Sequence, residues 1–232
     1  MGVLSEIVDA LLSPVRGAFG LGSADGVRER GREPPRDDSH DDIPAFDRRF
    51  DGTDPWKRLD GPARLSVYFA AAERDFGLYF EGPCATTVTT IEDVQAWLDG
   101  CAYASDMETF KRLDVWQHPR QFEERRRGDC EDFALWAWRR LIELGYDADL
   151  VLGIDRRRGS GTARRHVWIV FRREGGEYVY EPAERDRTRA VQPLAQIRAM
   201  YVPEFGVGPD RQVFAFAGRV MTLYGEPPAG ET

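Results

Sequence analysis

The stretch from Arg127 to Gly145 constrains the fold more than any other part of this sequence. Asp129 is a good N-cap residue, and Gly145 is a typical helix stop. Between them apolar residues recur at helical spacing, namely Phe133, Ala137, Leu141 and Leu144. The sequence therefore predicts a helix that follows Gly128 and carries Cys130 at its start.

After Gly145 the apolar period changes to two, which is typical of strands. Gly175-Gly176 is a hairpin signal between two of the apolar runs. Helices first and an antiparallel meander afterwards indicate an α+β fold, with the Cys130 helix packed on the sheet. The expected strands are 149–155, 165–172, 177–181 and 212–217. Besides the Cys130 helix, we expect a helix from Pro62 to about 75, a helix opened by a Thr89–Glu92 capping box that runs to about 104, a short helix at 107–113 and a helical turn from Pro119. Residues 76–83 are expected to be a loop or short strand.

Composition shifts divide the chain into four parts. Residues 1–19 are predicted to form an amphipathic helix, because one side of them is apolar. Residues 20–42 are rich in glycine, proline, serine and charge, which is typical of a disordered linker. The main domain is expected at 43–224, and residues 225–232 form a proline-rich tail expected to be flexible.

Charge and cysteine content exclude several classes of protein. The chain has 232 residues and a formal charge of −8, which argues against a general nucleic-acid binder. Its three cysteines are widely spaced, form no C-x-x-C motif and fit a reducing compartment. No run is long enough to span a membrane, and the N-terminus is a poor signal peptide, so a cytoplasmic location is expected.

Cys130, His166 and Glu181 form a candidate catalytic set. A helix N-terminus favours thiolate over thiol, whereas the neighbouring carboxylates Glu131 and Asp132 oppose it, so an imidazole partner is needed. His166 opens an almost wholly apolar strand, and Glu181 lies across the predicted hairpin. This is the nucleophile, base and orienting acid arrangement. The alternatives are a buried structural cysteine, a strand-end histidine and a solvated glutamate.

Strand register provides a check on Glu181. With Gly175-Gly176 as a two-residue loop, Glu181 faces Val170 and lies two pairs along the strand from His166, too far for a hydrogen bond. A longer loop or a bulge would bring it closer. If Glu181 is not the third member, the alternatives are the nearby Glu184 or Asp186, or a neutral amide elsewhere in the chain.

These motifs resemble the transglutaminase-like superfamily, and most closely its bacterial transglutaminase-like cysteine peptidases. The resemblance rests on Trp116-x-x-Pro119, the block Gly128–Ala134, His166-Val167-Trp168 and Glu181-Pro182. It implies a papain-like α+β core with Cys130 as nucleophile, His166 as base and Glu181 in the acid position. Family members usually carry aspartate there, so glutamate is a departure from the pattern.

The resemblance also bears on cofactors. No cofactor is required for the triad chemistry, but in some bacterial members acids beside the cysteine bind calcium. Asp129 and Glu131 are therefore candidate Ca²⁺ ligands, since Ca²⁺ prefers carboxylate oxygen. The alternative is that these acids only cap the helix.

The predicted activity is cysteine-dependent hydrolysis of peptide or amide bonds in a protein or peptide substrate. The Cys130 backbone N–H is expected to stabilise the oxyanion, and Trp116 either lines this cleft or belongs to the core. An amine in place of water would make the same site a transglutaminase. Two further alternatives are a non-catalytic binding module that keeps the fold, and a metal site using Cys130 and His166, which lacks further soft ligands.

Overall fold

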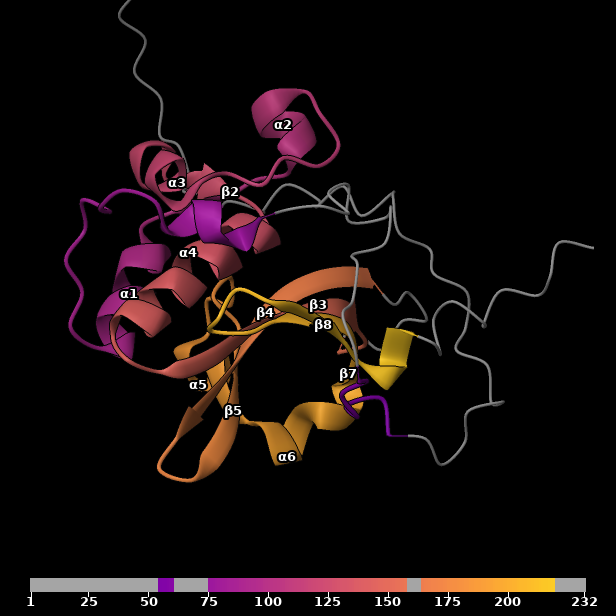
Figure 1. Ribbon diagram of the computed structural model, residues 1–232. Coiled ribbons are helices and arrows are strands. Elements are labelled where there is room, and N and C mark those ends of the chain that lie inside the picture. Colours follow the sequence, from indigo (N-terminus) through magenta and orange to yellow (C-terminus); the bar gives the residue numbers. More distant parts are fainter. Residues whose placement is uncertain (1–53, 61–74, 158–163, 220–232) are drawn as a thin grey trace, which may run out of the picture. The chain divides into compact units, whose positions relative to one another are not determined.

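The computed structural model describes residues 54–60, 75–157 and 164–219 (Figure 1). The helix predicted at residues 1–19, the linker at 20–42, the helix after Pro62 and the tail after 224 lie outside these residues, apart from Asp75. No helix in the described ranges combines the length and the hydropathy needed to cross a bilayer.

The first half of the described chain is mostly helical, as predicted, although residues 76–83, expected to be a loop or short strand, contain a 3-10 helix. The capping box lies one residue later than expected, because the Thr90 side chain accepts from the Asp93 backbone N–H. The helix it opens ends at Asp99, about five residues early, since the chain turns into a short strand at Ala102. The elements are η3 (Phe76–Phe80), α1 (Ile91–Asp99), β1 (Ala102–Tyr103), α2 (Asp106–Phe110), α3 (Pro119–Arg125), β2 (Arg127–Gly128) and α4 (Cys130–Glu143).

The second half forms a six-stranded antiparallel sheet in the order β6-β5-β4-β3-β7-β8. The predicted α+β class is thereby confirmed. β7 was not predicted, because Pro203 and Gly206 interrupt a run that otherwise reads as a strand. The elements are β3 (Asp147–Asp155), β4 (Arg164–Arg173), β5 (Gly176–Tyr180), α5 (Arg187–Ala190), β6 (Val191–Pro193), α6 (Leu194–Ile197), η4 (Arg198–Met200), β7 (Tyr201–Val207) and β8 (Val213–Ala215).

The hairpin between β4 and β5 differs from the predicted one in register. Arg173 pairs with Gly176, so the loop is Glu174-Gly175, with φ angles of 52° and 78°. Two left-handed residues are what a tight type I′ hairpin needs. Because Tyr180 pairs with Ile169, Glu181 comes opposite Trp168. Trp168 is two residues along β4 from His166 and points to the same face of the sheet. The predicted pairing of Glu181 with Val170 is therefore wrong.

Each face of the sheet is covered by its own hydrophobic cluster. Helices α1, α3 and α4 lie on one face, and α6 lies on the other (Figure 1). On the first face α4 packs against β3 and β4 and buries Phe133, Trp136 and Trp138. On the second face Trp56 packs edge-on against Trp168, with ring centroids 6.4 Å apart. This packing fixes the start of α4 relative to the sheet.

Gly153 allows β7 to cross close to β3 beside the site. It pairs with His166 on one side and with Pro203 on the other, where the β3–β7 register shifts. A Cβ on Gly153 would overlap the Val202 carbonyl oxygen and lie 2.8 Å from the Pro203 Cα. Both obstacles are backbone, so no side-chain rotation can relieve the overlap.

Gly153→Ala should therefore lower the free energy of unfolding by about 2 kcal/mol, measured by urea denaturation. Gly100→Ala is the control, because Gly100 has an ordinary φ of −81° and its Cβ would come no nearer than 3.3 Å to the Trp97 carbonyl oxygen. Equal stability of the two variants would contradict the close approach of β7.

Candidate active site

His166 lies on β4 and is held by Glu181. Its side chain is buried, and its Nε2 lies 2.7 Å from Glu181 Oε2. The ring stacks on Trp168 at a centroid distance of 6.1 Å. Nδ1 is buried and has no hydrogen-bond partner among the described residues. One ring nitrogen is thus engaged by a carboxylate while the other remains available as a base.

Glu181 is the residue that directly follows β5, and its carboxylate is buried. Its Oε1 accepts a hydrogen bond from the Tyr201 hydroxyl at 2.7 Å and lies 3.2 Å from Arg157 Nη2. Burial alone would raise its pKa, but His166, Arg157 and Tyr201 together hold the pKa of Glu181 below its ordinary value. Glu181 is therefore an ionised carboxylate shared by three donors.

Cys130 is the first residue of α4 and is not in a disulfide. It is partly buried, packs against the core cluster on the α4 face, and its Sγ lies 3.3 Å from Glu131 Oε2. The structure thus joins His166 to Glu181 and Cys130 to Glu131. A hydrogen bond from the thiol to His166 Nδ1 is not formed in this arrangement. In many enzymes catalytic hydrogen bonds of this kind tighten only when substrate binds.

Five carboxylates gather at the start of α4, and we call them the acidic cluster: Asp106, Asp114, Asp129, Glu131 and Asp132. Two sets of three offer ligand atoms within 4.8 Å of one another, namely Asp106 with Asp114 and Glu131, and Asp106 with Asp129 and Asp132. The sequence pointed to Asp129 and Glu131 alone. Asp132 follows Glu131 directly in α4 but was not assigned to the site. Asp106 and Asp114 were missed because the parallel pairing of β1 with β2 brings their segment to the start of α4.

Burial and mutual repulsion raise the pKa values of the carboxyl groups in the acidic cluster. Burial raises the pKa of Asp132 to about 8 and that of Glu131 well above its ordinary value, and repulsion from Asp129 adds to both. Burial also raises the pKa of Asp129, whose Oδ1 is buried without a hydrogen-bond partner among the described residues. Asp129 occupies the N-cap position yet makes no side-chain cap bond. Capping therefore does not explain it, and hard oxygen ligands in this number suit a divalent cation such as Ca²⁺.

Trp116 and Gln117 connect the acidic cluster to the core. Trp116 is buried, packs edge-on against Phe76 at 6.0 Å and donates its indole N–H to Asp114. These contacts are those of the core alternative for Trp116. Gln117, which sequence reasoning missed, donates from its backbone and its side chain to Asp132, at 2.8 and 2.6 Å. No local sequence signal marked Gln117, since its partner lies fifteen residues away.

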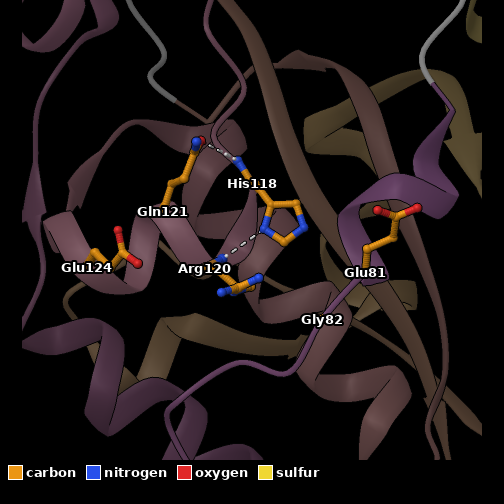
Figure 2. Close-up of a pocket in the computed structure, with 6 residues that line it drawn as sticks. All are labelled: Glu81, Gly82, His118, Arg120, Gln121 and Glu124. Carbon is orange, nitrogen blue, oxygen red and sulfur yellow. Dashed lines mark hydrogen bonds between the residues drawn. The ribbon is translucent and has the colours of Figure 1, made fainter.

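A polar pocket of about 590 Å³ lies between η3 and α3 and contains another histidine, His118 (Figure 2). His118 Nδ1 accepts from the Arg120 backbone N–H, and Nε2 lies 3.1 Å from the Leu78 carbonyl oxygen. Both ring nitrogens are thus used in holding the start of α3, and burial lowers the pKa of the ring. None of the predicted site residues lines this pocket, whose walls are Glu81, Gly82, His118, Arg120, Gln121 and Glu124.

Comparison with known proteins agrees with the motif resemblance. Residues 84–196 match the family described as bacterial transglutaminase-like cysteine proteinase, which confirms the predicted family resemblance. This match supports a cysteine peptidase-like function. The curated proteins yield no match.

Solved structures give more distant likenesses. Legionella pneumophila LapG is 17% identical, with a TM-score of 0.43, and the match covers 65% of this chain and 86% of that one. Its calcium-bound form gives the same identity and TM-score, over 65% and 87% of the two chains. A putative cysteine protease from Cytophaga hutchinsonii is 14% identical, with a TM-score of 0.34, over 62% of this chain and 46% of that one.

Proposed function

We propose, from the match of residues 84–196 to the bacterial transglutaminase-like cysteine proteinases, that this protein is a cysteine-dependent hydrolase of peptide or amide bonds in a protein or peptide substrate. The observation that carries the proposal is the buried pair of His166 and Glu181, 2.7 Å apart, with His166 Nδ1 left available. A histidine oriented by a carboxylate in this way is suited to act as a general base.

In the proposed reaction His166 Nδ1 takes the proton of Cys130, and the thiolate attacks the carbonyl carbon of the scissile bond. The tetrahedral oxyanion is stabilised by the Cys130 backbone N–H at the start of α4. The imidazolium then protonates the leaving amine, and a thioester forms. Water, deprotonated by His166, hydrolyses the thioester and restores the thiol. Glu181 stabilises the imidazolium in both halves of the reaction.

The acidic cluster is proposed to hold a divalent cation, with calcium as the first candidate. The cluster places ionisable carboxylates beside Cys130, and negative charge there opposes formation of the thiolate. A bound cation would neutralise this charge. In this way Asp129 and Glu131 would support both the stability of the α4 start and the reactivity of the thiol.

The test of the proposed function is the rate at which iodoacetamide alkylates each cysteine at about pH 6, mapped by mass spectrometry. Cys130 should react at least about tenfold faster than Cys84. These two thiols are matched in exposure, since both are partly buried, whereas Cys101 is fully buried. Burial raises the pKa of Cys84, and raises that of Cys101 to about 11, so both should remain thiols.

The labelling should be run both with calcium and with a chelator, and the unfolded protein should label at all three positions as the control. Slow labelling of Cys130 at the rate of Cys84, under both conditions, would exclude a nucleophilic cysteine. The non-catalytic binding module would then be the better description. Hydrolysis and transamidation share these residues, so product analysis with an added amine separates those two.

A further inference from the structure

We propose that Tyr201 and Arg157 are positioning residues that fix the Glu181 carboxylate, and thereby keep the neutral His166 ring protonated on Nε2 with its lone pair on Nδ1. We call these two residues the carboxylate clamp. The proposal deepens the proposed function, on which the catalytic meaning of the His166 orientation rests. The clamp itself concerns the geometry of four side chains and can be tested without a substrate.

The two oxygens of Glu181 are divided between different donors. Oε2 faces His166, while Oε1 faces the Tyr201 hydroxyl at 2.7 Å and Arg157 Nη2 at 3.2 Å. The Glu181 carboxylate lies at the end of a flexible side chain, so a fixed orientation of its two oxygens needs a constraint. Donors on Oε1 supply this constraint, because rotation of the carboxylate would break their bonds.

Arg157 is itself held in place. Its Nε and Nη2 lie 3.0 and 2.8 Å from the two carboxylate oxygens of Asp155, which is a two-pronged contact of high geometric specificity. Its guanidinium also lies over the Tyr201 ring, 5.1 Å from the centroid. Asp155 and Tyr201 are paired across β3 and β7. The clamp is thus built on two adjacent strands rather than on a free side chain.

Aromatic packing closes the set around the imidazole. Tyr201 packs against Trp168 at a centroid distance of 4.8 Å, and Trp168 stacks on the His166 ring. Burial, with the Glu181 charge next in effect, raises the pKa of Tyr201, so its hydroxyl remains a donor over the working pH range. Arginine is always charged. Glu181 therefore meets two permanent donors on Oε1 and can accept the His166 proton on Oε2.

The experiment is ¹⁵N NMR of the histidine rings in the full chain, at a pH where the rings are neutral. The chain has three histidines, and the His166 signals are assigned by their loss in His166→Gln. Wild-type His166 should show one tautomer, with the proton on Nε2. In Tyr201→Phe and in Arg157→Gln the two ring nitrogen shifts should move towards a common average, because the carboxylate is released. Arg157→Lys, which keeps the charge, should retain more of the single tautomer.

Tyr180→Phe is the matched control. Tyr180 is also buried in the sheet, but its hydroxyl has no hydrogen-bond partner among the described residues, so its removal should leave the His166 tautomer unchanged. A proton on Nδ1 in the wild type, or an unchanged tautomer in both Tyr201→Phe and Arg157→Gln, would overturn the clamp. Should Tyr201→Phe fail to fold, Arg157→Gln carries the test, since Arg157 is partly exposed.

Failure of the clamp and failure of the proposed function give different results. If Cys130 is alkylated slowly but the His166 tautomer changes in Tyr201→Phe and Arg157→Gln, the hydrolase proposal is wrong and the clamp proposal holds. If Cys130 is alkylated rapidly but the His166 tautomer is unchanged in both variants, the hydrolase proposal holds and the clamp proposal is wrong.

Discussion

His166→Ala should slow alkylation of Cys130 at about pH 6 by about a hundredfold, because the thiolate loses the imidazolium that stabilises it. Glu181→Gln should slow it less. Glutamine keeps the shape and can still accept a hydrogen bond, but it removes the negative charge 2.7 Å from the imidazole. The thiolate and imidazolium still stabilise each other in that variant. The expected order of alkylation rate is wild type, then Glu181→Gln, then His166→Ala.

Two matched controls separate these effects from general damage. His118→Ala removes the histidine that holds the start of α3, and should leave the labelling rate unchanged. Glu204→Gln alters another buried glutamate, which lies on β7 and pairs with Arg165 on β4, across the intervening strand β3. Cys130 in this variant should also be alkylated at the wild-type rate. If Glu181→Gln matches the wild type while His166→Ala is slow, Cys130 and His166 act as a dyad. If both match the wild type, these two residues are not partners.

The hydrogen bond between Glu181 and His166 could not be predicted from the sequence, for one local reason. Glu174 adopts a φ of 52°, a left-handed conformation that is unfavourable for glutamate, and this moves the loop one residue earlier than the glycine pair indicated. A shift of one loop residue moves the pairing by two positions. The alternatives Glu184 and Asp186 have local roles: Asp186 accepts from the Thr188 backbone at the start of α5, and Glu184 accepts from the Asp186 backbone.

Helix α4 and strands β3, β4 and β5 could be predicted because their apolar periods are local and long. The acidic cluster could be predicted only from the acids beside Cys130 in the sequence, and of these Asp132 was not recognised as a member. Asp106 and Asp114 depend on tertiary structure, since β1 and β2 pair over a separation of twenty-five residues. The role of Tyr201 could not be predicted either, because Tyr201 belongs to β7, where a proline and a glycine interrupt the sequence pattern of a strand.

Calcium should stabilise the protein, and its effect should grow with pH. A cation at a hundredfold excess over its Kd adds about 3 kcal/mol to the free energy of unfolding, which corresponds to a rise in Tm of about 5 to 10 °C for a chain of this size. The physical reason is that the acidic cluster must otherwise keep several buried carboxylates close together. Thermal unfolding with EDTA and with added Ca²⁺ measures the difference.

The sign of the pH dependence follows from Asp132, whose pKa is raised by burial from 3.8 to about 8. Without a cation the folded protein binds a proton there that the unfolded chain has released, so stability falls as pH rises between about 4 and about 8, by at most about 1.4 kcal/mol per pH unit for each such group. Between about pH 6 and pH 8 the carboxylates with lowered pKa values, such as Glu181, are already ionised and add no slope. Calcium should remove this loss, since it holds the carboxylates in their charged form.

Asp132→Asn tests the assignment directly. It removes one charge from the acidic cluster, so the chelated protein should become more stable near pH 8, while the response of Tm to calcium should shrink or vanish. Asp149→Asn is the control, because Asp149 is also buried with a raised pKa but pairs with Arg172 outside the cluster. Its response to calcium should equal that of the wild type. If neither EDTA nor calcium changes the Tm across this pH range, the acidic cluster does not bind the cation. Its buried carboxylates would then be accommodated by protonation alone.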